Sequence, residues 1–422
     1  MNANVKIFCD DLDQHAKAQV KLLSEHEAFA NGEIRIMPDG HAGHVVPIGF
    51  VAKVPSENPI MINAIGNDIG CGIICCKYNK PNKPLSFSKI DSLIRDHIPT
   101  GSNIHDKIPK PSYTGIELPD PYEFNAPIAA IMGDNYYKYN GTLGGGNHFI
   151  EIDQDDEGYI YVIVHTGSRG IGSAINKYYL DEVASRGKLL KSFQNKNNPY
   201  EMYCLYNNIY KLRYIEDTYN ASLYAAINRR EIISKIEKAL KLKRISYTES
   251  IHNKIVAYSD HSADDSNINK IRTAIAMDEH DLVITYTDLL YVKGAILTYD
   301  NFYNTEDQYR TQLNLNYTSD DIIPINSAEG CVLVRSKKNE DYLYCAPHGS
   351  GRTMMRSEVV NKYTVNSYKK MMKDIYSPTI NKNTLDEIPA AYRSLEDIKS
   401  NLEETVEIYK ILHPIYNYKG GK

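Results

Sequence analysis

The chain has 422 residues, of which 42% are hydrophobic and 24% charged, and its formal net charge at pH 7 is −5. This composition excludes a globally disordered chain, because the apolar content suffices for a sizeable core and the net charge is low. It also excludes a protein that coats nucleic acid by bulk positive charge, so any contact with RNA or DNA is expected to be local. No stretch approaches the roughly 18 consecutive apolar residues of a membrane-spanning helix, so we expect no membrane association.

The cysteines and the N-terminal residues indicate the cellular compartment in which the protein is expected to work. There are seven cysteines, an odd number, and three of them crowd together at Cys71, Cys75 and Cys76. Their spacing matches neither a disulfide framework nor a zinc ribbon. The first residues, MNANVKIFCDDLDQ, are acidic and lack the apolar segment of a secretory signal. These features favour a reducing, cytoplasmic environment.

Three segments, residues 40–73, 141–172 and 322–352, alternate β-branched runs with clusters of glycine. Such segments are typical of strands that end in tight loops. The intervening residues 175–243 are polar and rich in tyrosine, and we expect a helical insertion there. From Ser222 to Leu240 the apolar residues fit a helix with one buried stripe.

The remaining chain adds a loop and more helices. Residues 299–321 are polar without a clear period, which predicts a surface loop insertion. Residues 356–376 and 395–412 are predicted to be helices. No internal repeat and no linker-like stretch occurs. The simplest architecture is an α+β fold in which residues 1–422 form one mixed domain.

The glycine-rich segments hold an unusual set of polar residues. The sequence AIGNDIGCGI places Asp68 and Cys71 three residues apart between glycines, where both side chains can turn toward one point. Taken alone, a buried structural cysteine is the commoner interpretation. The other members of the set stand in loops farther along the chain: Asn147, His148 and Glu151; His165 and Arg169; His252 and Asn253; and His348 with Gly349, Gly351 and Arg352.

Each of these signals is weak by itself, but together they supply a thiolate, a carboxylate and several imidazoles. This mixture suits a transition metal such as Zn²⁺ or Mn²⁺ better than Mg²⁺ or Ca²⁺, which prefer oxygen ligands. Arg169 and Arg352 follow histidines in glycine-rich loops and are suited to bind phosphate. Cys75 and Cys76 lie in a strand-like run and are expected to be structural. His41 and His44 could line a site, but a loop role is the expectation.

The segments in which these residues occur resemble the RtcB family, which comprises GTP- and manganese-dependent RNA ligases. The resemblance rests on strings that follow in the family's order: MPDGHAGHVVPIG, DIGCG, GTLGGGNHFIEI, VHTGSRGIG, HN, KGA, PHGSGR, DEIPAAYRSLEDI and the terminal YKGG. It covers the chain from Met37 to Gly420. It implies one RtcB-like domain with central β-sheets wrapped by helices. It also implies joining of RNA 3′-phosphate or 2′,3′-cyclic phosphate ends to 5′-hydroxyl ends, for tRNA splicing or RNA repair.

The resemblance also implies roles for single residues. His348 matches the nucleophile that forms a covalent bond to GMP. Two manganese ions are implied, the first on Cys71, His148 and His165, the second on Asp68, Cys71 and His252. The residues that match the nucleotide site are Asn147, Glu151, Asn253, Pro324, Ser327, Cys331, Gly349, Gly351, Tyr392 and Lys419. Arg169 and Arg352 are expected to contact RNA.

One segment departs from the family pattern. The family's Pro-Gly-Ser-Met-Gly loop reads Pro324-Ile325-Asn326-Ser327-Ala328 here, and Cys331 replaces a serine. Isoleucine removes the backbone freedom of glycine, and a thiol is a weaker hydrogen-bond donor than a hydroxyl. We therefore expect a divergent member in which nucleotide preference or substrate choice has shifted.

Two other functions stay open at this point. One is a two-metal phosphoesterase that processes RNA ends without joining them, and the other is an inactive RNA-binding paralogue. The complete set of metal-binding residues and His348 favour the ligase. The sequence names neither the physiological RNA nor an oligomeric state, and it does not show whether an archease-type activator protein is needed.

Overall fold

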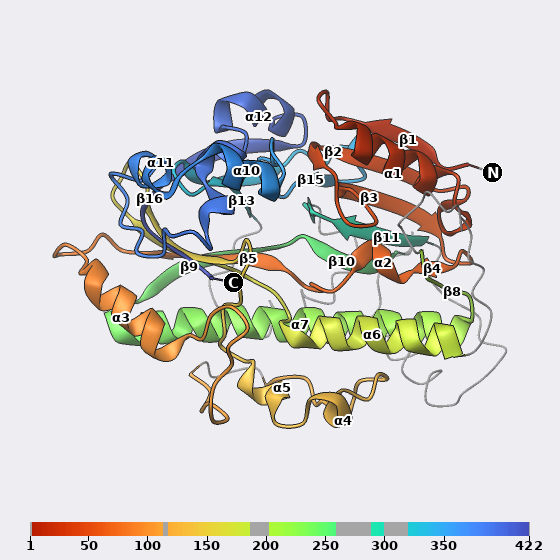
Figure 1. Ribbon diagram of the computed structural model, residues 1–422, viewed down its shortest axis with the longest axis horizontal. Helices are drawn as coiled ribbons and strands as arrows, with labels where there is room; N and C mark the ends of the chain where they lie inside the picture. Colours follow the sequence, from red (N-terminus) through yellow and green to blue (C-terminus); the bar gives the residue numbers. More distant parts are fainter. Residues whose placement is uncertain (1, 113–116, 186–201, 259–287, 299–319, 422) are drawn as a thin grey trace.

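A computed structural model describes residues 2–112, 117–185, 202–258, 288–298 and 320–421. The fold is α+β, as the sequence predicts, with two large sheets and helices around them (Figure 1). The segment 299–321, predicted as a surface loop, lies outside the described residues except for Asp320 and Asp321.

The larger sheet has seven strands in the order β13-β14-β16-β6-β7-β5-β9. Their bounds are Asp321–Asn326, Gly330–Ser336, Val406–Lys419, Phe149–Gln154, Ile160–Thr166, Gly72–Tyr78 and Arg244–Ile251. All its neighbouring strands are antiparallel. The predicted strand segments 141–172 and 322–352 supply β6, β7 and the hairpin of β13 and β14, and β5 begins within the segment 40–73.

The second sheet has five strands in the order β1-β2-β3-β11-β10, with bounds Asn4–Ile7, Glu33–His41, Ile48–Pro55, Asp288–Lys293 and Asn253–Tyr258. Two short pairs complete the described strands: β12 (Ala295–Leu297) with β15 (Cys345–Pro347), and β4 (Ile60–Met61) with β8 (Cys204–Leu205). Strand β9 of the large sheet leads through His252 alone into β10 of the second sheet. The chain therefore crosses between the two sheets at that histidine.

The longest helix, α7 (Asn208–Leu240), lies along the large sheet with α6 (Gly170–Ser185) beside it (Figure 1). It contacts β5, β7 and β10 as well as α3 (Phe87–His97) and α6. Every residue from Asn220 to Ser234 is buried, so the predicted helix exists but its single buried stripe does not. Because protein covers α7 on several sides, its polar side chains meet other buried polar groups instead of water.

Smaller helices border the sheets. These are α1 (Gln14–Ser24), α2 (Ile62–Ile65), α4 (Ile128–Met132), α5 (Asn135–Lys138), α10 (Arg356–Lys362), α11 (Val365–Met371) and α12 (Leu395–Leu402). The helix predicted over 356–376 is two short helices, since Thr364 caps the second with its side chain.

The helix predicted over 395–412 is wrong in its second half. Helix α12 ends at Leu402, and β16 begins at Val406. The residues VEIYKILHPIYNYK are rich in β-branched and aromatic side chains, which pack well on a pleated sheet. Hydrogen bonding to β14 and β6 stabilises these residues as a strand, although the residues before them form a helix.

Candidate active site

The order of the strands brings the predicted metal-binding residues to one edge of the large sheet. Cys71 directly precedes β5, and His148 directly precedes β6. His165 lies near the end of β7, and His252 directly follows β9. Because β5 is antiparallel to β7 and β9, and β6 is antiparallel to β7, these four strand ends meet. The histidine of β7 faces Ile73 of β5 and Phe149 of β6 in the register.

The side chains converge around the thiol of Cys71. Its Sγ lies 3.2 Å from Nε2 of His165 and 3.6 Å from Nε2 of His148. The same nitrogen of His165 lies 3.2 Å from Nε2 of His252, and Nε2 of His148 lies 3.2 Å from Oδ2 of Asp68. These atoms form two groups that share Cys71.

The two groups divide the histidines differently from the division implied by the resemblance. Cys71, His165 and His252 form one group, and Asp68, Cys71 and His148 form the other. The resemblance instead places His148 with His165, and His252 with Asp68. Both arrangements share Cys71 as the residue common to two ions.

The protonation of these groups suits metal binding. Nδ1 of His148 lies 3.0 Å from the carbonyl oxygen of Leu143, so Nδ1–H can donate there, and a metal ion at Nε2 would take the place of the proton that is shared with Asp68. Burial lowers the pKa of His165 and of His252 well below the usual value, so both rings are neutral. Although burial alone would raise it, the pKa of Asp68 is lowered by His148.

Burial and the neighbouring Asp68 raise the pKa of the Cys71 thiol. A bound divalent cation reverses this effect, because it stabilises the thiolate. The donors therefore fit a pair of transition-metal ions: one thiolate, neutral imidazoles whose Nε2 atoms face each other, and one carboxylate.

Helix α7 holds the loops that carry these residues. Asn228 accepts hydrogen bonds from the backbone N–H groups of Gly141 and Thr142 and donates to the carbonyls of Thr142 and Gly167. Arg229 donates from Nη1 to the carbonyls of Gly70 and Thr166, each at 2.9 Å. The helix thus connects the loop before Cys71, the loop before His148 and the end of β7.

A cavity of about 1110 Å³ opens beside this cluster. All but three of the predicted site residues line it. The exceptions are His148, which contacts Cys71 and Asp68, and Cys331 and Arg169. Arg169 donates from Nε to Thr142 at 3.1 Å and from Nη2 to the carbonyl of Gly101 at 2.9 Å. It therefore points into the loop before His148 and not into the cavity.

His348 follows β15 and faces the cavity, with its ring centroid 4.9 Å from that of His252. Its Nδ1 lies 2.8 Å from Oδ2 of the fully buried Asp39. The carboxylate accepts from Nδ1–H, which leaves Nε2 with the lone pair. Gly351 permits the close approach of this loop to β2, since a Cβ there would lie 2.5 Å from the carbonyl oxygen of Asp39, and its φ is +76°.

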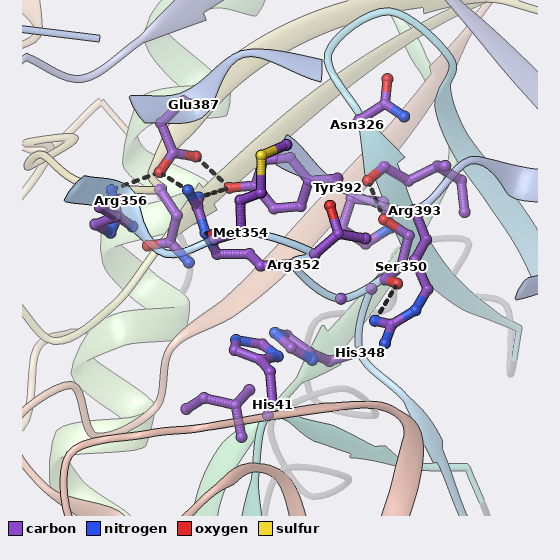
Figure 2. Close-up of a pocket in the computed structure, with 18 of the residues that line it drawn as sticks. His41, Asn326, His348, Ser350, Arg352, Met354, Arg356, Glu387, Tyr392 and Arg393 are labelled. Carbon is purple, nitrogen blue, oxygen red and sulfur yellow. Dashed lines mark hydrogen bonds and ion pairs between the residues drawn. The ribbon is translucent and has the colours of Figure 1, made fainter. Parts of the chain in front are cut away.

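At the other end of the cavity, the buried Glu387 contacts four side chains, of which Tyr392, Arg352 and Arg356 are labelled in Figure 2. Its carboxylate accepts from the hydroxyl of Tyr392 at 2.6 Å and pairs with Arg352, Arg356 and Lys419. Burial would raise the pKa of Glu387, but Lys419 and the two arginines lower it. Arg352, expected to contact RNA, lies over the ring of Tyr392 and donates to its hydroxyl.

Glu151 also lines the cavity, and its carboxylate accepts from the side-chain amide of Asn417 and from the Cys331 thiol. The predicted nucleotide residues Pro324 and Ser327 lie on or next to β13 and line the cavity, and Asn147 and Asn253 line it near Cys71. The turn after β13 is closed by Asn326, whose side chain accepts from the N–H groups of Ala328 and Glu329.

Comparison with known proteins places this geometry in a family. The model of the family described as "tRNA-splicing ligase RtcB" matches residues 19–118 and 126–420. The chain belongs to the RtcB family. It is 25% identical to the RNA-splicing ligase RtcB of Escherichia coli (strain K12), over 99% of this chain and 98% of that protein. It is 24% identical to the tRNA-splicing ligase RtcB of Nanoarchaeum equitans, over 94% and 91%.

In this RtcB chain, sequence reasoning missed residues that support the site. Asp39 and Glu387 stand inside the strings MPDGHAGHVVPIG and DEIPAAYRSLEDI that carry the resemblance, but neither was given a role. Asn228 and Arg229 lie in a helical segment, and their sequence context gives no signal of a role beyond their polar character.

Among the helices that the structure describes, none has both the length and the apolar character needed to span a membrane.

Proposed function

We propose that the chain is an RNA ligase that joins 3′-phosphate or 2′,3′-cyclic phosphate ends to 5′-hydroxyl ends by way of a covalent bond between His348 and GMP. The observation that carries this proposal is the position of His348. It is an imidazole held by a buried carboxylate, next to a cluster of metal-binding side chains, at the wall of a cavity of about 1110 Å³. Family membership supplies the reaction class.

In this proposal Asp39 fixes the ring of His348 with the proton on Nδ1, and Nε2 attacks the α-phosphorus of GTP. A P–N bond forms as the bond to the β-phosphate oxygen breaks, and pyrophosphate leaves. Two Mn²⁺ ions held by Asp68, Cys71, His148, His165 and His252 would offset the phosphate charge. A Cβ built on the neighbouring Gly349 would meet only the carbonyl oxygen of Pro324, at 3.4 Å, so the loop is not crowded on that side.

GMP then passes from His348 to the RNA 3′-phosphate, and a cyclic phosphate is first opened to that form. The 5′-hydroxyl of the other RNA end attacks the activated phosphorus and releases GMP. The phosphate in the new bond therefore comes from the 3′ end. Arg169 and Arg352 are proposed to contact RNA only if they leave their present partners.

For the base, we propose that Glu151 accepts from the N1–H and N2–H groups of guanine and that Lys419 donates to O6 or N7. Glu387 orients both Lys419 and the hydroxyl of Tyr392, whose ring can stack on the base. Cys331 reaches this site through Glu151 rather than by facing the cavity. GTP is therefore proposed to be preferred over ATP.

The proposed reaction also suggests the RNA substrate and the cellular compartment. We propose cytoplasmic RNA with a 3′-phosphate or cyclic phosphate and a 5′-hydroxyl end as the substrate, from tRNA splicing or RNA repair. All seven cysteines are buried free thiols, which agrees with a reducing compartment. An archease-type protein is a candidate activator.

The test combines nucleotide transfer with joining. The chain is incubated with Mn²⁺ and GTP labelled at the α-phosphate, and an acid-labile protein adduct is expected; ATP and Mg²⁺ serve as controls. Joining of a 3′-phosphate RNA to a 5′-hydroxyl RNA is then measured. A two-metal phosphoesterase would process the ends without forming an adduct, and an inactive RNA-binding paralogue would do neither.

The His348→Ala variant sharpens this test. It is expected to form no adduct but to keep its metals, since His348 is not in either group of metal-binding atoms. It should still join RNA supplied with a preformed guanylylated 3′-phosphate, because that step needs no new P–N bond. An adduct in this variant would show that the nucleophile is another residue.

A further inference from the structure

The chain has a basic surface next to the end of the cavity where Glu387 lies. Residues 356–382, which contain α10 and α11, hold six lysines and arginines against two acidic residues, although the whole chain has a net charge of −5. Figure 1 shows both helices across the large sheet from α7. The overall charge therefore hides a local positive potential, and such a potential attracts anionic partners.

Few side chains attach this segment to the rest of the fold. Val359 of α10 and Tyr368 of α11 are buried in one apolar cluster with Leu385, Ile388 and Ala391. Most other residues of the two helices are exposed. Five exposed lysines form what we call the lysine surface: Lys362, Lys369, Lys370, Lys373 and Lys382.

The lysine surface is short of anionic partners. Lys373 lies 3.9 Å from Asp374, and both side chains are strongly exposed. Among the described residues, none of the other four lysines of the surface forms an ion pair. Elsewhere Lys410 lies 2.8 Å from both Asp155 and Glu157. Like charges on neighbouring residues repel one another when no anion lies between them, so the lysine surface suits a polyanion.

Apolar side chains are exposed among these lysines. They are Met355, Val360, Met371 and Tyr376, and the exposed fraction of Met355 is 66%. Tyr376 is held in place, because its ring stacks on Tyr416 with centroids 5.8 Å apart and its backbone pairs with β16. Surfaces that bind single-stranded nucleic acid combine positive charges along the backbone with side chains that the bases can cover.

The lysine surface is continuous with the cavity. Residues 352–358 line the cavity, and α10 begins within them at Arg356. Nζ of Lys362 lies 3.8 Å from Sδ of Met354, which is one of the lining residues. Figure 2 labels Met354 and Arg356 at this end of the cavity, together with Glu387. An RNA strand whose end lies in the cavity can therefore continue over α10 and α11.

We propose that the lysine surface binds the phosphates of the single-stranded RNA that adjoins the end held in the cavity. The proposal rests on the proposed function, which supplies RNA as the substrate. Lysines contact phosphates and the exposed apolar side chains accept any base, so this surface reads no sequence. It favours RNA that extends beyond the cavity over RNA that ends inside it.

The test measures binding of a labelled single-stranded RNA of about 20 nucleotides by fluorescence anisotropy. The double variant Lys369→Glu/Lys370→Glu is expected to bind about 10-fold more weakly than the unaltered protein. The slope of log K against log salt concentration should fall by about 1.4, at about 0.7 for each lost phosphate contact. Lys241→Glu/Lys243→Glu makes the same charge change at two exposed lysines after α7 and should bind as the unaltered protein does.

The difference between the two double variants should vanish as the RNA is shortened to the few nucleotides that the cavity holds. Circular dichroism checks that each variant is folded. If Lys369→Glu/Lys370→Glu binds the long RNA as tightly as the unaltered protein, or if the control variant loses as much, the proposal is overturned. Should the glutamate variant unfold, Lys369→Gln/Lys370→Gln must show the same fall in salt slope.

Two RNAs are measured separately, one that ends in a 3′-phosphate and one that begins with a 5′-hydroxyl. Weaker binding of either supports the surface and shows which strand lies on it. Formation of the GMP adduct is a separate readout that the variants should leave unchanged. RNA binding through these lysines without any adduct would overturn the proposed ligase and keep the surface. An active ligase whose RNA binding is insensitive to Lys369→Glu/Lys370→Glu would do the reverse.

Discussion

At the scale of single residues, Cys71 has the central position among the metal-binding side chains. It is the only residue common to both groups of metal-binding atoms, and it is held between His148 and His165. Asp68 and His165 each belong to one group. Removal of the thiol should therefore affect two ions, whereas removal of either neighbour should affect one directly.

We predict that Cys71→Ala loses more Mn²⁺ than Asp68→Ala or His165→Ala. The reason is that the alanine leaves neither ion a bridging ligand, while the other two variants leave one group intact. Metal per chain, measured by mass spectrometry after dialysis, checks this. Full metal content in folded Cys71→Ala would contradict the assignment of a shared ligand.

Asp39 gives a second prediction at this scale. Asp39→Asn should lower the rate of GMP transfer to His348 by at least about 10²-fold, because an amide can donate to Nδ1 and shift the ring proton to Nε2. The initial rate of adduct formation measures the effect. Metal content should not change, and His41→Asn, which alters another histidine at the cavity wall, serves as the matched control. An unchanged rate in Asp39→Asn would remove Asp39 from the mechanism.

The predicted site residues that the structure brings together are those whose chemistry is visible in the chain itself. A histidine at the end of an apolar strand, such as His165, signals a site because strand ends carry function. Asp39 gave no such signal, since its importance arises from a contact with His348 across 309 positions of sequence. Arg169 is the opposite case. Its sequence context predicts phosphate binding, but in the structure its side chain donates hydrogen bonds to Thr142 and Gly101.

At the scale of elements, α7 has a role that its sequence period did not reveal. The helical period from Ser222 to Leu240 predicts one apolar stripe, yet Asn228 and Arg229 are fully buried on other sides of the helix. A period detects apolar residues that face a core, but it does not detect polar residues that face buried backbone groups. Each such residue here satisfies carbonyl or N–H groups of the loops around the site.

We predict that Asn228→Ala lowers the free energy of unfolding by about 1–3 kcal/mol, because buried N–H and carbonyl groups of Gly141, Thr142 and Gly167 lose their partner. Mn²⁺ affinity should also fall, by about 10–100-fold, as the loop before His148 loosens. Urea unfolding and metal titration measure the two effects. Lys238→Ala, at an exposed position of the same helix, is the control. Unchanged affinity would reduce the role of Asn228 to stability alone.

At the scale of the whole molecule, the site depends on a strand order that local sequence does not specify. The metal-binding residues come from the ends of β5, β6, β7 and β9, and His348 follows a strand paired with β12. Local patterns predict that strands exist, but the neighbours of a strand depend on packing between distant segments. The resemblance to the RtcB family supplied what local patterns did not. Its sequence strings, taken together, implied that these distant residues form one site.

This architecture leads to a prediction for the folded state as a whole. Ions bound at Cys71 would connect both large sheets, since His252 joins β9 of one to β10 of the other. An ion that binds only the folded chain stabilises it by about 4 kcal/mol at a free concentration of about 1,000 times its Kd. Mn²⁺ should therefore raise the thermal unfolding midpoint by several degrees in calorimetry, and a chelator should reverse the rise. Mg²⁺ should have little effect, because a thiolate and imidazoles are poor ligands for it. The Cys71→Ala variant should lose the Mn²⁺ response, and an equal response to Mg²⁺ would show that the stabilising ion binds elsewhere.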